Sequence, residues 1–168
     1  MPDAPGLELI RGEIEMDHPG AVLDTSFDRG QSALVVDPEQ IIALLTWLKD
    51  SPGHEYSFLS SLHAADYLPA EPRFVVHYEL LNRDRAERLR VKAPLATVDP
   101  EIDSCVDLFP TANFQEREAY DFFGIGFRGH PELTRILLPD DYVGWPLRRD
   151  FPVGGEPVKF TYNERNYG

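Results

Sequence analysis

Proline is spread through the last quarter of the chain, and it limits what that part can fold into. Five prolines fall between residues 125 and 168, namely Pro131, Pro139, Pro146, Pro152 and Pro157. Proline breaks helix interiors and cannot donate a backbone hydrogen bond to a sheet, so a long helix or an interior strand is excluded here. The same residues include many aromatic and aliphatic side chains, such as Phe127, Trp145, Phe151 and Phe160. We therefore predict an extended tail over residues 125–168 whose apolar side chains something else must cover.

The first half of the chain has the patterns of regular structure. Residues 32–37, SALVVD, are typical of a short strand. Asp37 can then cap a helix that has Pro38 at its first position and Gln40 in place to complete a capping box. The spacing i, i+3, i+4, i+7 predicts a buried stripe of Ile41, Leu44, Leu45 and Leu48.

Three further segments alternate between apolar and polar residues, as half-buried strands do. They cover residues 56–68, 73–84 and 87–96, and turn-forming residues separate them. In the second segment, Phe74, Val76, Tyr78 and Leu80 share one face. These patterns predict an antiparallel meander, and with the helix they indicate an α+β domain over residues 1–124 with an antiparallel or mixed sheet and covering helices.

Two more helices are predicted before the tail, over residues 100–109 and 113–123. Asn113 can cap the second helix, Glu116 stands at the position that reaches back to the cap, and Gly124 can end it. On this interpretation, Glu116→Ala would cost about 0.5–2 kcal/mol as the loss of a capping partner.

Composition excludes several classes of function. The chain has 29 acidic and 16 basic residues, a net charge of -13 and a single cysteine, Cys105. Such a charge disfavours binding to nucleic acid or to an anionic membrane surface. One thiol can form neither an intrachain disulfide nor the ligand set of an iron–sulfur cluster. The N-terminus lacks the features of a secretory signal and no run of apolar residues approaches twenty, so we expect a soluble protein or one peripheral to another component.

Four residues near the tail raise the possibility of a metal or acid–base site: Glu116, Glu118, Asp121 and His130. Carboxylates and an imidazole could bind a divalent cation, as in a small metal-dependent hydrolase. The spacing disfavours this, because residues two apart on a helix point in opposite directions, whereas Arg117 and Asp121 are four apart and can pair with each other. We find no nucleotide-binding glycine motif and no GxSxG.

Residues 116–152, EREAYDFFGIGFRGHPELTRILLPDDYVGWPLRRDFP, resemble the signature of a known family. The family is the C subunit of the proton-pumping NADH:quinone oxidoreductase, respiratory complex I, called the J subunit in chloroplasts and cyanobacteria. Its frame is filled here by Glu116, Arg117, Glu118, Asp121, Phe122, Phe123, His130, Arg135, Leu137 and Leu138, and GWPLRRDFP continues it.

The resemblance implies a protein without a cofactor or catalytic residue of its own. FMN, iron–sulfur clusters and quinone would be bound by other subunits, and this chain would lie in the peripheral arm against the D, B and I subunits. It would support electron transfer from NADH to quinone, coupled to proton translocation, on the cytoplasmic side of the membrane. The resemblance implies that signature residues, among them Trp145, lie at subunit interfaces, with Arg135, Arg148 and Arg149 as candidate anchors. An equivalent component of a membrane-bound hydrogenase or ferredoxin-driven complex is the alternative.

Overall fold

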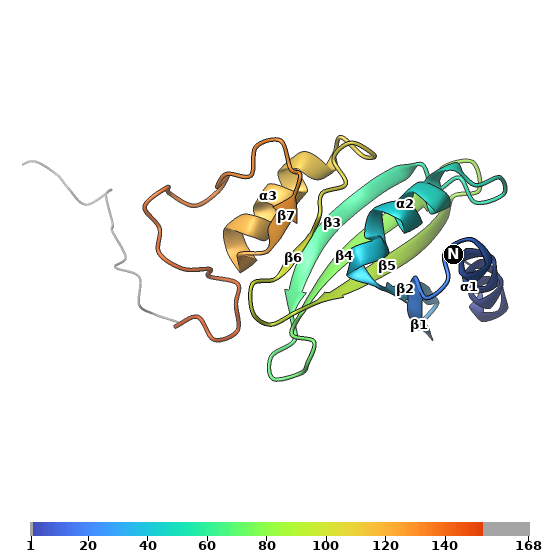
Figure 1. The fold of residues 1–168 in the computed structure, drawn as a ribbon, viewed down its shortest axis with the longest axis horizontal. Coiled ribbons are helices and arrows are strands. Elements are labelled where there is room, and N and C mark those ends of the chain that lie inside the picture. Colours follow the sequence, from blue (N-terminus) through green and yellow to red (C-terminus); the bar gives the residue numbers. More distant parts are fainter. Residues whose placement is uncertain (1, 153–168) are drawn as a thin grey trace, which may run out of the picture.

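The computed structural model describes residues 2–152, so the predictions for Pro157, Phe160 and the rest of the tail beyond Pro152 lie outside the described residues. A five-stranded sheet forms the centre of the fold, in the order β1-β2-β5-β4-β3 (Figure 1). The strands are β1 Val22–Asp28, β2 Gln31–Val36, β3 Phe58–Asp66, β4 Phe74–Asn82 and β5 Glu87–Leu95. β2 and β5 pair in parallel and the other neighbours are antiparallel. The predicted α+β class with a mixed sheet is confirmed.

The predicted meander is the sequence β3, β4, β5, each strand antiparallel to the next. Its inward face is the one that alternation predicted, because Phe74, Val76, Tyr78 and Leu80 on β4 are all fully buried. The predicted strand before residue 38 is β2.

Three helices cover this inward face. They are α1 Ala4–Asp17, α2 Ile41–Asp50 and α3 Ala112–Phe123. Figure 1 shows α2 lying across the sheet and α3 alongside β3. Buried residues of all three helices join the inward side chains of the strands in one hydrophobic core, so the helices lie on the same side of the sheet.

The helix predicted after Asp37 begins with one turn of 3-10 helix, η1 Pro38–Gln40, and continues as α2. The Asp37 carboxylate accepts a hydrogen bond from the Glu39 N–H at 3.1 Å, whereas Gln40 makes no side-chain cap bond. The four residues of the predicted stripe are all fully buried.

The N-terminal helix and strand, α1 and β1, were not predicted. The signals for α1 are nevertheless in the sequence, because the Asp3 carboxylate caps Gly6 N at 2.8 Å and Pro5 lies in the first turn. Leu7, Ile10 and Ile14 then form its buried stripe.

The helix predicted over residues 100–109 is wrong. This segment contains a short strand, β6 Glu101–Asp103, which pairs in parallel with β7 Gly126–Arg128. Because its partner strand lies 25 residues later, inside the predicted tail, local pattern could not reveal the pairing. The side chain of Phe127 on β7 enters the core, so the fold continues past Gly124. The division into units at residues 1–124 and 125–168 stays a prediction.

Candidate functional site

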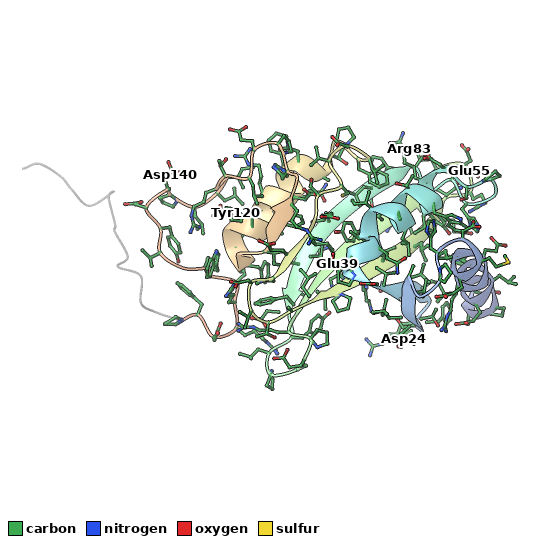
Figure 2. The ribbon with its side chains drawn as sticks, viewed as in Figure 1. Asp24, Glu39, Glu55, Arg83, Tyr120 and Asp140 are labelled. Carbon is green, nitrogen blue, oxygen red and sulfur yellow. The ribbon has the colours of Figure 1, made fainter. Side chains whose placement is uncertain are left out.

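The C-terminal arm, defined here as residues 129–152, has no helix or strand and runs around the C-terminal half of α3 (Figure 1). Figure 2 shows Asp140 on the outer loop of the arm and Tyr120 on α3. Most of the family-signature residues lie on α3 or on this arm. Their contacts explain how a segment without regular structure takes a defined path.

Asp121 on α3 is the main anchor of the arm. Its Oδ2 accepts hydrogen bonds from three successive backbone N–H groups, those of Ile136, Leu137 and Leu138, at 2.9–3.1 Å. Its Oδ1 accepts another from Arg135 Nη1 at 2.7 Å. Burial raises the pKa of this carboxyl, but these donors favour the charged form more strongly and hold the pKa below its usual value.

Arg135 and Arg117 bind backbone carbonyl groups of the arm. Arg135 Nη2 donates to the Tyr142 carbonyl at 3.1 Å, while Arg117 donates from Nε to the Thr134 carbonyl and from Nη2 to the Arg135 carbonyl, both at 3.1 Å. The predicted pair of Arg117 with Asp121 is therefore wrong, because Asp121 binds Arg135. Asp121 is therefore paired with Arg135, from the arm, and not with Arg117, its neighbour on the helix.

Asp66, at the end of β3, anchors the far end of the arm. Its carboxylate binds Arg73 Nη2 at 2.8 Å and accepts the Arg149 N–H at 2.8 Å. Arg73 also pairs with Asp150 at 2.6 Å, and the Arg149 guanidinium donates to the Leu68 carbonyl. Burial raises the pKa of Asp66, but Arg73 and the backbone donors outweigh it and lower the pKa to about 2.

Trp145 and Arg148 pack together between these two anchors. The Arg148 guanidinium lies 4.0 Å from the centroid of the Trp145 ring and 5.0 Å from that of Phe74, and its Nε donates to the Phe123 carbonyl at 2.7 Å. Gly124 ends α3 at φ +68°, as predicted, and the indole packs directly on it. A Cβ at this position would lie 2.3 Å from the ring.

Glu116 does not cap α3, contrary to prediction. The helix begins at Ala112 after Thr111, and Glu116 is fully buried one turn further on. Its carboxylate accepts hydrogen bonds from Ser104 Oγ at 2.6 Å and Cys105 N at 2.8 Å, so it joins α3 to the segment after β6. Burial raises the pKa of Glu116.

His130 begins the arm as a buried, fully bonded imidazole. Its Nδ1 accepts the Glu132 N–H at 3.0 Å, and its Nε2 lies 3.2 Å from the Asn113 carbonyl oxygen, which requires a proton on Nε2. Glu116 Oε2 is 4.0 Å from Nε2.

The metal site considered from the sequence has no geometric basis in this arrangement. Glu116 and Asp121 face different partners, and Glu118 lies exposed on α3. Within residues 2–152, no group of three or more His, Cys, Asp and Glu side chains is arranged to hold a metal ion.

Comparison with known proteins identifies the family. Residues 34–157, which include α3 and the whole arm, match the family model of the respiratory-chain NADH dehydrogenase 30 kDa subunit. The chain belongs to this family.

Individual relatives of the 30 kDa family agree in sequence and fold. The C subunit of NADH-quinone oxidoreductase from Roseiflexus castenholzii is 44% identical over 146 residues, which cover 87% of this chain and 84% of that protein. A trypsin-resistant fragment of Nqo5 has 30% sequence identity and a TM-score of 0.64, covering 76% of this chain and 98% of the fragment. A chain of the archaeal membrane-bound sulfane sulfur reductase has 25% identity and a TM-score of 0.70, covering 87% of this chain and 85% of its own length.

Arg117, Asp121, Arg135 and Arg148 of the predicted signature thus hold the arm on α3. Sequence reasoning missed three further residues that hold the arm. Asp66, Arg73 and Asp150 are charged residues beside strand ends and turns, where solvated charge is the ordinary interpretation. No sequence signal marks them, because the burial of Arg73, which a charged residue tolerates only with partners, is visible only in the folded chain.

The arm exposes several large apolar side chains beside the acids Glu132, Asp140 and Asp141. The side chains of Leu137, Val143 and Leu147 have exposed fractions of 62%, 88% and 52%, and Trp145 is also partly exposed. Large apolar groups exposed together on one segment are typical of a surface that another protein covers. No helix in residues 2–152 is long and apolar enough to cross a membrane.

Proposed function

We propose that this chain is a peripheral-arm subunit of an NADH:quinone oxidoreductase, with a structural role beside the quinone-reducing module. The observation that carries the proposal is the C-terminal arm, whose arginines and several backbone N–H groups are bonded within the chain while Leu137, Val143 and Leu147 are exposed. The high coverage of the C subunit of NADH-quinone oxidoreductase from Roseiflexus castenholzii supports the assignment. The whole complex would transfer electrons from NADH to quinone and translocate protons.

The arm is the proposed docking surface for the neighbouring D, B and I subunits. Arg135, Arg148 and Arg149 bind carbonyl and carboxylate oxygens of this same chain, so their role would be to fix the path of the arm. Contact with neighbours would then come from Leu137, Val143 and Leu147 on its outer side. A rigid arm loses little conformational entropy on association, which favours tight binding.

The chain would bind no cofactor itself. Its one cysteine, Cys105, is buried, and burial raises the pKa of the thiol well above its usual range, which disfavours the thiolate that clusters require. FMN, iron–sulfur clusters and quinone would belong to other subunits. The chain would lie on the cytoplasmic side of the membrane and contact it through the complex.

A second assignment is the equivalent component of another membrane respiratory complex. It is favoured by the fold shared with the chain of the sulfane sulfur reductase. The proteins that deliver electrons differ between the two assignments, so the identity of the co-purifying chains separates them.

Purification of the tagged chain from its native membranes, followed by mass spectrometry, tests the proposal. We expect homologues of the D, B and I subunits to co-purify with wild type, and the combined Leu137→Glu and Val143→Glu variant to lose them because two charges would be buried at the interface. Leu9→Glu is the matched control, since Leu9 on α1 is similarly exposed at 69%. Retention of all partners by the double variant would show that the arm is not the docking surface. Stoichiometric iron or flavin in the isolated chain would refute the cofactor-free role.

A further inference from the structure

The face of the sheet opposite the helices carries a row of cations along β5. The inward positions of this strand, Leu89, Val91 and Ala93, are fully buried in the core shared with the helices. The outward positions that alternate with them carry Arg88, Arg90 and Lys92. No helix in residues 2–152 packs on this outer face, because all three contribute to the core on the other side.

Two of these three cations have no side-chain partner among residues 2–152. Arg90 pairs with Glu79 on β4. Arg88 and Lys92 make no side-chain hydrogen bond or ion pair with any residue in the described part of the chain. A chain with 29 acidic and 16 basic residues offers many possible partners, so two cations left unpaired within the described residues, on a face that no described helix covers, call for an explanation. Such groups attract carboxylates.

Two histidines adjoin this row. His77 lies opposite Lys92 in the β4–β5 pairing and opposite His63 in the β3–β4 pairing, and the two imidazole rings stack with their centroids 4.9 Å apart. His77 Nδ1 is buried without a hydrogen-bond partner among the described residues. Burial, followed by the charges of His63, Lys92 and Arg90, lowers the pKa of His77 to about 4.

An apolar hollow lies at the end of the cation row. It has a volume of about 380 Å³ and is lined mainly by Val35, Tyr67, Val75 and Pro94, with Lys92 at its edge. The acid that also lines it, Glu71, already accepts a hydrogen bond from Thr97. The hollow and the cation together fit an apolar side chain that has a carboxylate beside it.

We propose that the outer face of β4 and β5 is a second docking surface, occupied by an acidic segment of a neighbouring protein in the complex. Carboxylates of that segment would pair with Lys92 and Arg88, and an apolar side chain would fill the hollow beside Val75. Arg88 and Lys92 are four residues apart on a strand, which places their Cα atoms about 13 Å apart and requires acids at a similar separation. The inference rests on the proposed function, because it requires an assembled complex.

Lipid and nucleic acid fit this face poorly. Nucleic acid and anionic lipid surfaces carry many negative charges over a large area. They would therefore repel a chain whose net charge is -13. A short acidic protein segment needs to contact only the cations of β5.

Zero-length carbodiimide cross-linking of the purified native complex tests the proposal. This reagent joins an amine to a carboxylate in direct contact, so we expect Lys92 to be coupled to an Asp or Glu of another subunit. Lys49 is the internal control, because it lies on α2, on the helix-covered side of the sheet. Lys92→Gln should abolish the coupled product while leaving the yield of any Lys49 product unchanged. A Lys92 that couples to no other chain would overturn the proposal.

Charge reversal provides an independent test. We expect the combined Arg88→Glu and Lys92→Glu variant to bind the remaining subunits about tenfold more weakly at low salt, with the difference shrinking as salt is added. The combined Arg11→Glu and Arg29→Glu variant makes the same charge change on α1 and on the exposed β1–β2 turn, and should bind as wild type does. Thermal melts would confirm that both variants fold.

The outcomes separate this surface from the proposed function. If the β5 variant and its control bind equally well, the second surface is wrong while the arm remains the docking site. If no other subunit co-purifies with the wild-type chain, both the proposed function and this surface fail.

Discussion

The sheet and the C-terminal arm of this chain are held in place by different forces. The sheet is stabilised by one apolar core to which α1, α2 and α3 all contribute. The arm contributes little to that core and is fixed through the carboxylates of Asp121 and Asp66, which accept backbone N–H groups of the arm. The stabilisation from hydrophobic burial depends on the buried apolar area, and many sequences can supply it. The stabilisation from a buried carboxylate depends on the position of each hydrogen-bond donor around it.

The contrast explains how one chain can hold a stable domain and a defined binding segment together. An arm with its own core would need many more residues. Instead, a few charged groups hold a short segment whose outward apolar side chains remain available for a partner. The two regions should therefore respond differently to mutation and to pH.

The largest effect is expected from a cavity in the sheet core. Leu44 on α2 is fully buried, so Leu44→Ala should lower the free energy of unfolding by about 4 kcal/mol. Both regions should unfold together in a denaturant melt, because the arm is anchored to the domain. Leu9→Ala on the exposed side of α1 is the control and should change stability by less than about 0.5 kcal/mol. A variant in which the arm keeps its structure after the sheet melts would contradict the comparison.

Loss of the main anchor should affect the arm more than the sheet. Asp121→Asn removes the charge and one of the two carboxylate oxygens, so a single amide oxygen is left to serve both Arg135 and the three backbone N–H groups, at an expected cost of about 3 kcal/mol. Hydrogen exchange should accelerate at Ile136, Leu137 and Leu138 while β4 and β5 stay protected. Glu118→Gln, on the exposed side of the same helix, should leave exchange unchanged. Equal loss of protection in the sheet would show that the two regions are not separable.

Acid should release the far end of the arm first. The folded-state pKa of Asp66 is about 2, below its ordinary value of 3.8, so its contribution of about 2–3 kcal/mol is present at neutral pH and is lost as the pH falls from about 4 to 2. Fluorescence of Trp145 in a Trp47→Phe background should report this release. Asp66→Asn should remove most of the pH dependence in that range. Unchanged fluorescence down to pH 2 in the parent would contradict the prediction.

A smaller effect is expected at the buried carboxylate of α3. Glu116→Ala leaves Ser104 Oγ and Cys105 N without their acceptor, but it also relieves the burial of a charge, as the raised pKa indicates. We expect a net loss of about 2 kcal/mol in a thermal melt. Glu116→Gln keeps an acceptor and should lose less. An alanine variant as stable as wild type would show that the two donors find other partners.

The smallest of these effects is expected at the end of α3. Gly124→Ala places a side chain at φ +68° and against the Trp145 indole, at an expected cost of about 1.5 kcal/mol. The indole should move, which Trp145 fluorescence in the Trp47→Phe background would detect. Gly12→Ala within α1 is the control, because a Cβ there meets no atom within 4 Å, and it should be neutral or stabilising. An unmoved indole would show that the contact with Gly124 does not set its position.

Alternation and helical spacing in the sequence predicted much of the fold correctly. Phe74, Val76, Tyr78 and Leu80 face the core as their period of two indicated, and the stripe from Ile41 to Leu48 is buried as its helical spacing indicated. The misses have physical reasons. β6 is three residues long and its partner is distant in sequence, so no local pattern marks it. Glu116 was assigned to a cap because helix-start signals are local, while its actual donors belong to the segment after β6.

Patterns of contiguous residues were enough to establish the α+β class, the meander within a sheet, and the family, because burial periodicity and a long signature can be read along the chain. The partners of the charged residues could be known only from the folded chain. Asp121 binds Arg135 and three backbone N–H groups, Asp66 reaches Arg149, and the cations of β5 lie on an open face. A charged side chain has many possible partners in sequence. Its actual partner depends on which segments the folded core brings within hydrogen-bonding distance.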